Sequence, residues 1–335
     1  MHKAIALFSG GLDSSLAILA VLRQGIAVRA VRFLTPFDLD IHVKAPDMKT
    51  EGPLLRSPGF EVEIRKLDER FLTILKNPKH GYGKNMNPCI DCRILMLKET
   101  INLMEETGAG FIISGEVVGQ RPMSQKRDML YHIDKEAGVP GRILRPLCAK
   151  LLRITIPEQK GIINREMLYD FSGRSRKPQM ALAKEFGLDD YPIPAGGCLL
   201  TEPNFSLRLK DLLAYNPSAS IKDIELLKTG RHFRLSPVCK VIVGRDSNEN
   251  ETIEHLAERK DCQLRVETCG SPTTLVTGEI TAGDIVTAAA ICARYSDAKA
   301  LPKVDVTVLQ NERIVSIKVA PAEKQYMDSL RIAGS

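Results

Sequence analysis

The sequence predicts an α/β protein with a doubly wound parallel sheet, followed by a smaller C-terminal α+β domain. Three observations predict this fold class. Short apolar, β-rich runs alternate with helical patterns in the first half, a stretch rich in Gly and Ser follows the first run, and the pattern changes after residue 200. Alternating strands and helices are typical of a parallel sheet covered by helices on both faces.

Periodicity predicts the elements of the first half in order. We expect strands at residues 4–8, 26–34, 60–68 and 111–116, and helices at residues 12–25 and 92–109. A polar, Pro-rich segment at residues 35–59 interrupts the alternation. We expect it to form a surface insertion or lid.

The pattern after residue 200 predicts two connecting helices and then a small domain. The helices are expected at residues 204–217 and 220–230. The α+β domain is expected from segments 238–244, 261–268, 284–296, 303–309 and 313–319, with a hairpin turn at 310–313. We therefore divide the chain into a catalytic domain (1–203), a helical linker (204–229) and a C-terminal domain (230–335).

Composition indicates a globular, cytoplasmic protein. The chain has 335 residues, of which 44% are apolar and 26% charged. No apolar run approaches the ~18 residues of a membrane span, and the first residues lack the layout of a signal peptide. In a reducing compartment, the eight cysteines are more often metal ligands, redox groups or core residues than disulfides.

Positive charge gathers in two segments. Residues 121–184 carry 14 basic and 6 acidic side chains, and residues 228–245 contain five basic residues and no acid. A polyanion such as RNA is the partner that such segments favour. A solvated surface, or a protein-contact surface in the C-terminal domain, is the alternative.

Residues 8–15 read FSGGLDSS and come directly after the first expected strand. Glycines let backbone N–H groups approach an anion, and the start of a helix adds unpaired donors and partial positive charge. The expected phosphate-binding residues are Ser9, Gly10, Gly11, Asp13, Ser14 and Ser15. Neither GxxxxGK[ST] nor GxGxxG is present. A tight turn with a capped helix is the alternative, but capping needs only one such side chain.

The string SGGLDSS resembles the PP-loop of the ATP pyrophosphatase superfamily, whose fold is adenine nucleotide α-hydrolase-like. The resemblance implies an enzyme that binds ATP, cleaves it between the α and β phosphates and adenylates a carbonyl-type oxygen. Asp13 would hold a Mg²⁺ ion that neutralises phosphate charge. Phe33 would lie against the adenine or in the core, and Gly115 and Gln120 would contact the nucleotide.

Three cysteines have spacings that indicate chemistry. Cys89 and Cys92 form a C-x-x-C after Pro88 at the start of a helix, and Cys198 follows two glycines in YPIPAGGCLLT. A C-x-x-C alone allows a redox dithiol, half a metal site or a structural accident. Three thiolates are too few for a closed zinc site but suit a 4Fe–4S cluster with one open iron, which could hold a sulfide.

These strings are similar to the cluster-dependent tRNA thiolation enzymes, particularly short relatives of the tRNA 4-thiouridine synthetases. Residues 114–125, 142–152 and 172–188 resemble the same group, and residues 230–250 resemble the RNA-binding portion of the NFACT family. The resemblance implies an ATP-dependent tRNA sulfurtransferase. Cys89, Cys92 and Cys198 would hold the cluster, tRNA would be the substrate, and sulfide or a sulfur-donor protein would supply sulfur.

Three alternatives stay open. Cys89 and Cys198 could act as a persulfide and resolving pair without a cluster, as in 2-thiouridylases. The chain could also be a PP-loop ligase that moves nitrogen, or an RNA-binding adaptor with an inactive loop. The sequence does not determine the modified uridine, the sulfur donor or whether the protein forms a homodimer. The other five cysteines are expected mainly in the core, with a second site at Cys262 and Cys269 as the less favoured option.

Overall fold

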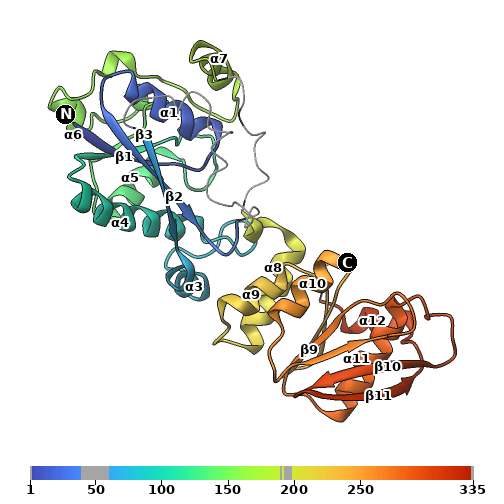
Figure 1. Ribbon diagram of the computed structural model, residues 1–335. Helices are drawn as coiled ribbons and strands as arrows, with labels where there is room; N and C mark the ends of the chain where they lie inside the picture. The colour runs from blue at the N-terminus through green and yellow to red at the C-terminus, as the bar shows by residue number, and fades with distance from the viewer. Residues whose placement is uncertain (1, 39–59, 189–190, 192–197, 333–335) are drawn as a thin grey trace. The chain divides into compact units, whose positions relative to one another are not determined.

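The computed structural model describes residues 2–38, 60–188, 191 and 198–332. It divides into two compact units, Met1–Cys198 and Leu199–Ser335, and each is described by itself (Figure 1). The expected three-part division at residues 203 and 229 stays a prediction. Within the described part of the chain, no helix has both the length and the apolar character needed to cross a membrane.

The first unit contains a five-stranded sheet in the order β3–β2–β1–β4–β5, with parallel pairing throughout. Its strands are β1 (Lys3–Leu7), β2 (Ala27–Leu34), β3 (Phe60–Lys66), β4 (Phe111–Ser114) and β5 (Ile143–Leu144). The chain begins in the centre with β1, extends to β2 and β3 on one side, and then crosses to β4 on the other. The doubly wound parallel sheet expected from the sequence is therefore confirmed.

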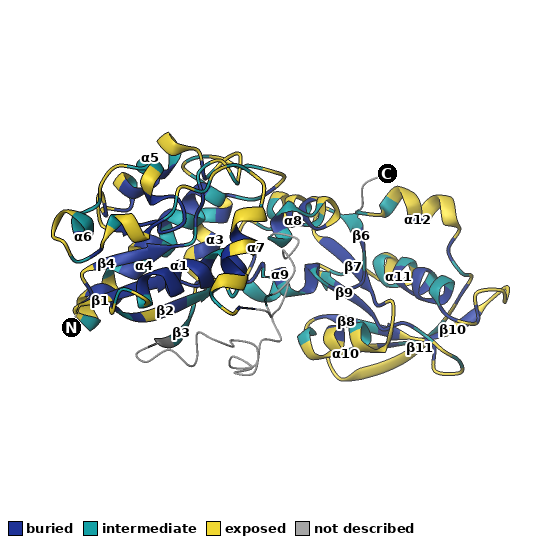
Figure 2. Cartoon of the chain, turned by 90° about the horizontal axis from the view of Figure 1, so that it is seen from above, coloured by how far each residue is buried: buried dark blue, intermediate teal, exposed yellow. Residues whose placement is uncertain are grey.

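Helices cover both faces of this sheet (Figures 1 and 2). They are α1 (Leu12–Leu22), α3 (Asp68–Lys76), α4 (Cys89–Thr107), α5 (Arg127–Glu136), α6 (Ile156–Gln159) and α7 (Lys177–Glu185), with short 3-10 turns η1 (Ala149–Leu151) and η2 (Arg165–Met167). Successive strand residues point to opposite faces. Ala4 and Ala6 therefore pack in a core with α1 and α7, whereas Ile5 and Leu7 pack in another with α4 and α5.

The start of α4 places the C-x-x-C pair. The helix begins at Cys89, directly after Pro88, rather than at residue 92 as the apolar pattern predicted. It ends before Gly108, whose φ of +69° closes it in the left-handed conformation. Both Cys89 and Cys92 consequently lie in the first turn of α4, near the positive end of the helix dipole.

Several elements of the first unit were not predicted. Helix α5 is mostly polar and buries only Leu130, Ile133 and Asp134, so no apolar run marks it in the sequence. Strand β5 has two residues, which is too short for a sequence signal. Of the insertion expected at residues 35–59, residues 39–59 lie outside the described residues.

The second unit begins with the expected helices and continues as an antiparallel α+β domain. After the short η3 (Leu199–Thr201) come α8 (Pro203–Tyr215) and α9 (Ile221–Leu227), and a six-stranded sheet follows in the order β11–β10–β8–β9–β7–β6. Its strands are β6 (Arg231–Ser236), β7 (Cys239–Val243), β8 (Cys262–Arg265), β9 (Thr274–Gly278), β10 (Val304–Gln310) and β11 (Arg313–Val319). The remaining helices are α10 (Ser247–Leu256), α11 (Ala282–Tyr295) and α12 (Lys324–Leu330).

The expected C-terminal hairpin is present. Gln310 pairs with Arg313, and the two residues between them, Asn311 and Glu312, have φ values of +49° and +66°. Two consecutive positive φ values are those of a type I′ turn, which matches the twist of a hairpin. Strands β6 and β9 were not predicted, because β6 (RHFRLS) is rich in basic residues and β9 has only a short apolar run.

Candidate active site

The SGGLDSS loop lies at the carboxyl end of β1, the central strand. Strands β2 and β4 flank β1, so the loop lies where the strand order reverses. Ligands of doubly wound sheets bind in the crevice beyond this edge. Gly10 has a φ of +77°, and a Cβ atom there would be 3.7 Å from Nη1 of Arg32 on β2. Arg32 is therefore a cation beside the loop that sequence reasoning missed.

Gly115 fixes how closely the loop approaches β4. A Cβ atom at Gly115 would be 2.6 Å from the backbone nitrogen of Ser14 and 2.7 Å from the carbonyl oxygen of Asp13. Any side chain there would push the first turn of α1 away from the sheet. Gly115 is thus required for the position of the helix N-terminus, whereas a direct contact with nucleotide stays a prediction.

The loop hydroxyls stabilise the loop itself. Ser14 and Ser15 donate to the carbonyl oxygen of Gly11 at 2.8 and 3.2 Å, and Ser9 Oγ lies 3.2 Å from Ser14 Oγ. Gly11 is the N-cap of α1 and provides no side-chain cap. The start of α1 therefore presents backbone N–H groups without a capping side chain, which is an arrangement that favours an anion.

Asp13 is held by residues from two distant segments. Gln120 Nε2 donates to its Oδ2 at 2.8 Å, and Arg176 Nη2 lies 3.9 Å from its Oδ1. Gln179 Nε2 in turn lies 3.5 Å from Gln120 Oε1. The buried Oδ1 accepts no hydrogen bond from the described residues. This oxygen has a lone pair to offer, so Asp13 fits the role of a Mg²⁺ ligand.

A buried ion network lies directly behind this loop. Glu116, just after β4, accepts from Arg145 at 3.0 Å and lies 3.0 Å from Arg93 Nε. Arg145 also donates two hydrogen bonds to Asp134, at 2.9 and 2.7 Å. Burial raises the pKa of Glu116, but the two arginines outweigh it and lower that pKa to about 2. Glu116 is therefore a charged structural anchor at neutral pH.

Two of the predicted cysteines, Cys89 and Cys198, lie close enough to the third, Cys92, to act on its ionisation. Burial raises the pKa of Cys92 well above its ordinary value, and the neighbouring thiols of Cys198 and Cys89 raise it further. Burial also raises the pKa of Cys89, whereas hydrogen bonds from the backbone at the start of α4 and the charge of Arg121 lower it. Residues separated by more than 100 positions in the sequence thus interact in space.

This cysteine group lies at the same edge of the sheet as the SGGLDSS loop. Cys198 Sγ is 4.0 Å from the carbonyl oxygen of Phe37, which follows the carboxyl end of β2. Arg93, next to Cys92, donates to Ser114 Oγ at 2.7 Å, at the end of β4. Both contacts are with segments that flank β1, so the thiols lie beyond the edge where the loop lies.

Three thiols suit an iron–sulfur cluster in kind and number, and the carboxylate of Asp38 also lies within electrostatic range of Cys92. Among the described residues, however, no group of three or more His, Cys, Asp or Glu side chains is arranged to hold a metal ion. The role of Cys89, Cys92 and Cys198 as ligands therefore stays a prediction.

Two regions of the chain match known sequence families. Residues 1–151 match the family described as thiamine biosynthesis protein (ThiI). We call these residues the ThiI-family domain, after the family model that they match. Residues 230–331 match the NFACT protein RNA binding domain. The resemblances stated from the sequence are confirmed for both regions, and Cys198 lies outside the matched part of the ThiI-family domain.

Curated relatives match this chain over only part of their own length. A probable tRNA sulfurtransferase of Bacillus velezensis is 32% identical over 146 residues, covering 43% of this chain and 34% of the relative. One from Lysinibacillus sphaericus is 29% identical over 161 residues, covering 48% and 38%. One from Thermococcus kodakarensis is 26% identical over 154 residues, covering 43% and 36%. The chain thus matches little more than a third of these relatives.

Solved structures show more distant likeness. A 4-thiouridine synthetase in complex with RNA and ATP aligns with 23% identity and a TM-score of 0.36, covering 56% of this chain and 52% of that one. The C-terminal part of a fibronectin/fibrinogen-binding protein from Streptococcus suis aligns with 10% identity and a TM-score of 0.28, covering 72% and 94%.

Two side chains of the ThiI-family domain correct or extend the sequence interpretation. Phe33 is half-buried and packs against the core formed with α4, so the core contribution is present, and contact with adenine stays a prediction.

His80 was not assigned a partner from the sequence. Its Nδ1 lies 2.8 Å from Asp91 Oδ1 and its Nε2 lies 2.9 Å from His132 Nε2. Only folding brings these three side chains together.

The remaining cysteines behave largely as core residues. Cys148, Cys239, Cys262 and Cys292 are fully buried, as expected, and burial raises the pKa of each. Cys269 is only half-buried.

Proposed function

We propose that this protein is an ATP-dependent tRNA sulfurtransferase that adenylates a uridine carbonyl oxygen and then replaces that oxygen with sulfur. The observation that carries the proposal is the interaction of Cys92 with both Cys89 and Cys198 at the sheet edge that holds the SGGLDSS loop. A sulfur-handling group next to a phosphate-binding loop is the combination that this reaction needs. The names of the curated relatives support the same reaction class.

The loop would hold ATP by its phosphates. The uncapped start of α1 offers N–H groups to the phosphate oxygens, and Arg32 adds a positive charge beside Gly10. Asp13 would hold a Mg²⁺ ion through Oδ1, while Gln120 keeps its other oxygen in place. These donors stabilise the charge that develops on pyrophosphate as it leaves, which is the dominant electrostatic contribution expected at this step.

The proposed reaction has two displacements. A uridine flipped out of its stack attacks the α-phosphorus of ATP through its carbonyl oxygen, the bond to the bridging oxygen breaks, and pyrophosphate leaves. Sulfide then attacks the activated ring carbon and AMP leaves with the original oxygen. No net oxidation or reduction occurs with sulfide as the sulfur source, so the reaction needs only ATP, sulfide and the tRNA. Cys89, Cys92 and Cys198 would hold a 4Fe–4S cluster, whose open iron would present the sulfide.

Anaerobic purification tests the sulfur chemistry. We expect brown protein with about four irons per chain, and loss of both iron and tRNA thiolation in Cys198→Ala. Cys269→Ala is the matched control, since this thiol lies in the other unit, and it should keep both. Colourless, iron-free protein that still thiolates tRNA would falsify the cluster and favour the persulfide alternative with Cys89 and Cys198.

The type of atom transferred has its own test. ATP-dependent AMP formation with tRNA is compared in the presence of sulfide and of ammonia. Turnover with sulfide alone supports thiolation, turnover with ammonia points to a nitrogen-transferring ligase, and no pyrophosphate release with any RNA points to a binding adaptor. Mass spectrometry of tRNA nucleosides from cells with and without the protein then identifies the thionucleoside.

A further inference from the structure

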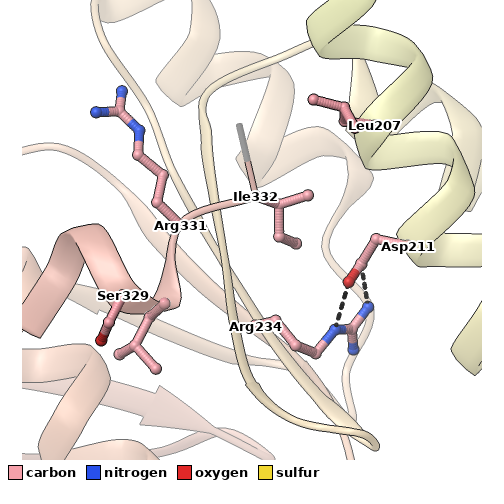
Figure 3. A pocket seen from close by; sticks show the side chains of 7 residues that line it. Leu207, Asp211, Arg234, Ser329, Arg331 and Ile332 are labelled. Atoms are coloured by element: carbon pink, nitrogen blue, oxygen red, sulfur yellow. Dashed lines mark hydrogen bonds and ion pairs between the residues drawn. The ribbon is translucent and has the colours of Figure 1, made fainter. Parts of the chain in front are cut away.

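The C-terminal unit has a pocket of about 350 Å³ along β6, here called the β6 pocket (Figure 3). Residues from α8, from β6, and from the end of α12 and the segment directly after it line the pocket, including Leu207, Asp211, Arg234, Ser329, Arg331 and Ile332. Backbone pairing fixes the chain end, because Ile332 N–H donates to the His232 carbonyl oxygen at 2.9 Å and Arg331 forms a bridge with Phe233. Three separate segments therefore build one site.

One wall of the β6 pocket carries a positioned cation, Arg234, and an aromatic ring lies beside this cation at the edge of the pocket. Arg234 donates two hydrogen bonds to Asp211, one of them at 3.1 Å (Figure 3). Its guanidinium also lies 4.7 Å from the ring centre of Tyr215, at the end of α8. That ring is 50% exposed. An exposed ring beside a fixed arginine is a platform on which a nucleic-acid base stacks.

Two further arginines have no carboxylate partner. Arg331 is exposed, its guanidinium points away from Asp211 in Figure 3, and it forms no side-chain hydrogen bond or ion pair with the described residues. Arg208 donates to the Leu227 carbonyl oxygen at 3.0 Å, but its buried Nε has no partner in the described part of the chain. The exposed guanidinium of Arg331 is thus available to an anion from outside.

Other positively charged side chains lie near Arg208 and Arg331. Burial lowers the pKa of Arg208 most, and the positive charges of Arg245 and Arg331 lower it further. Burial lowers the pKa of the neighbouring Lys240 to about 7. The carboxylates within range already have partners. Asp211 pairs with Arg234, Glu249 pairs with Arg245, Glu202 caps α8 and Asp223 caps α9. An anion in the β6 pocket would relieve the repulsion that remains.

We propose that the β6 pocket binds the phosphodiester backbone of RNA, with Arg331 on the phosphate and Tyr215 beneath a base. The proposal rests on the proposed function and extends it in one respect. Helix α8 lies outside the segment 230–331 that matches the RNA-binding family, so the RNA site includes a helix that precedes that segment. The exposed ring favours RNA over an acidic protein segment as the occupant.

Binding of an unmodified tRNA transcript to the full-length protein tests the proposal by fluorescence anisotropy over a range of salt. Arg331→Ala should weaken binding about tenfold and reduce the salt slope by about one. Leu207→Glu, which adds a negative charge on α8, should weaken binding similarly. Arg313→Ala is the control, because this exposed arginine lies on β11, at the opposite edge of the sheet, and should bind as wild type.

The outcomes separate the proposal from its rivals. The proposal is overturned if both pocket variants bind tRNA with the affinity and salt slope of the wild type. It is also overturned if the pocket variants lose binding to a poly-glutamate peptide while their tRNA binding is unchanged. A thermal shift by inorganic phosphate that disappears in Arg331→Ala, with tRNA affinity unchanged, assigns the pocket to free phosphate instead. Failure of the proposed function is seen differently, as wild-type protein that binds tRNA but releases no pyrophosphate.

Discussion

Gly115 and Glu116 show how two adjacent residues act on the candidate site in different ways. Gly115 lacks a side chain, and this absence lets the first turn of α1 lie against the end of β4. Glu116 contributes a charge, which Arg93 and Arg145 keep ionised in the interior. Neither needs to touch a substrate to affect the chemistry, because both set the position of groups that would.

Gly115→Ala should disturb the candidate site more than the fold. The new Cβ would meet backbone atoms at 2.6–2.7 Å, so the start of α1 must move, at a cost of about 1–3 kcal/mol. We expect pyrophosphate release to fall at least tenfold while the protein stays folded by circular dichroism. Gly110→Ala is the matched control, since a Cβ there has no neighbour within 4 Å. Equal activity in the two variants would contradict the close approach.

Glu116→Gln should destabilise the first unit by about 3–5 kcal/mol, because it leaves buried arginine charge without its partner. The folded pKa of Glu116, about 2, lies below its ordinary value of 4.5. Its contribution is therefore complete above pH 4.5 and is lost as the pH falls towards 2. Urea unfolding at pH 7 and pH 3 checks this. The difference between variant and wild type should shrink at pH 3, and a constant difference would contradict the ionised carboxylate.

At the scale of elements, Asp91 ties the loop before α4 to the start of that helix. Asp91 in the first turn of α4 accepts hydrogen bonds from the backbone N–H of His80 at 2.9 Å and faces the His80 ring. The ring also meets His132 on α5. This contact joins a connecting loop to two helices and thereby fixes the direction in which the turn carrying Cys89 and Cys92 enters the helix.

Asp91→Ala should loosen that loop without unfolding the sheet. Removal of both acceptor oxygens leaves the half-buried His80 groups without their partner. Hydrogen exchange of residues 78–88 should become at least tenfold faster, with exchange in β1 and β4 unchanged. Asp170→Ala, at an exposed position, should leave exchange as in wild type. Unchanged exchange at residues 78–88 in Asp91→Ala would show that the loop is held by other contacts.

At the scale of the whole molecule, each unit has its own hydrophobic core. The first unit has one core on each face of its parallel sheet, and the second packs α11 against its antiparallel sheet. Independent cores let two units unfold separately. A buried group that strains one unit should therefore leave the stability of the other unchanged.

Lys240→Met tests this separation through pH. Burial lowers the folded pKa of Lys240 from 10.5 to about 7. The unfolded chain then binds more protons between these values, so stability rises with pH across this window, by about 1.4 kcal/mol per unit. Replacement by methionine should stabilise the second unit most below pH 7 and least above pH 10. Calorimetry should show a shift in one transition only. A gain independent of pH would contradict a charged, buried amine.

Sequence reasoning succeeded where the determining residues lie close together in the chain. The turn at Asn311 and Glu312 and the glycines of SGGLDSS act through their own backbone preferences, which local patterns express. It failed for α5, which is mostly polar, and for β6, which is rich in basic residues. It also failed for Arg32 and Gln179, which are ordinary polar residues of a strand and a helix in the sequence.

The sequence by itself determined the fold class, the loop at the end of the first strand and the three cysteines that we propose for sulfur chemistry. Only the tertiary structure decided which residues from distant segments lie next to one another. It placed Gly115 against Ser14, Gln120 on Asp13, and Cys198 near Cys92. The physical reason is the distance along the chain over which each effect acts. Backbone preferences and hydrophobic periods act over a few residues, whereas contacts between distant segments depend on how every element packs around the shared cores.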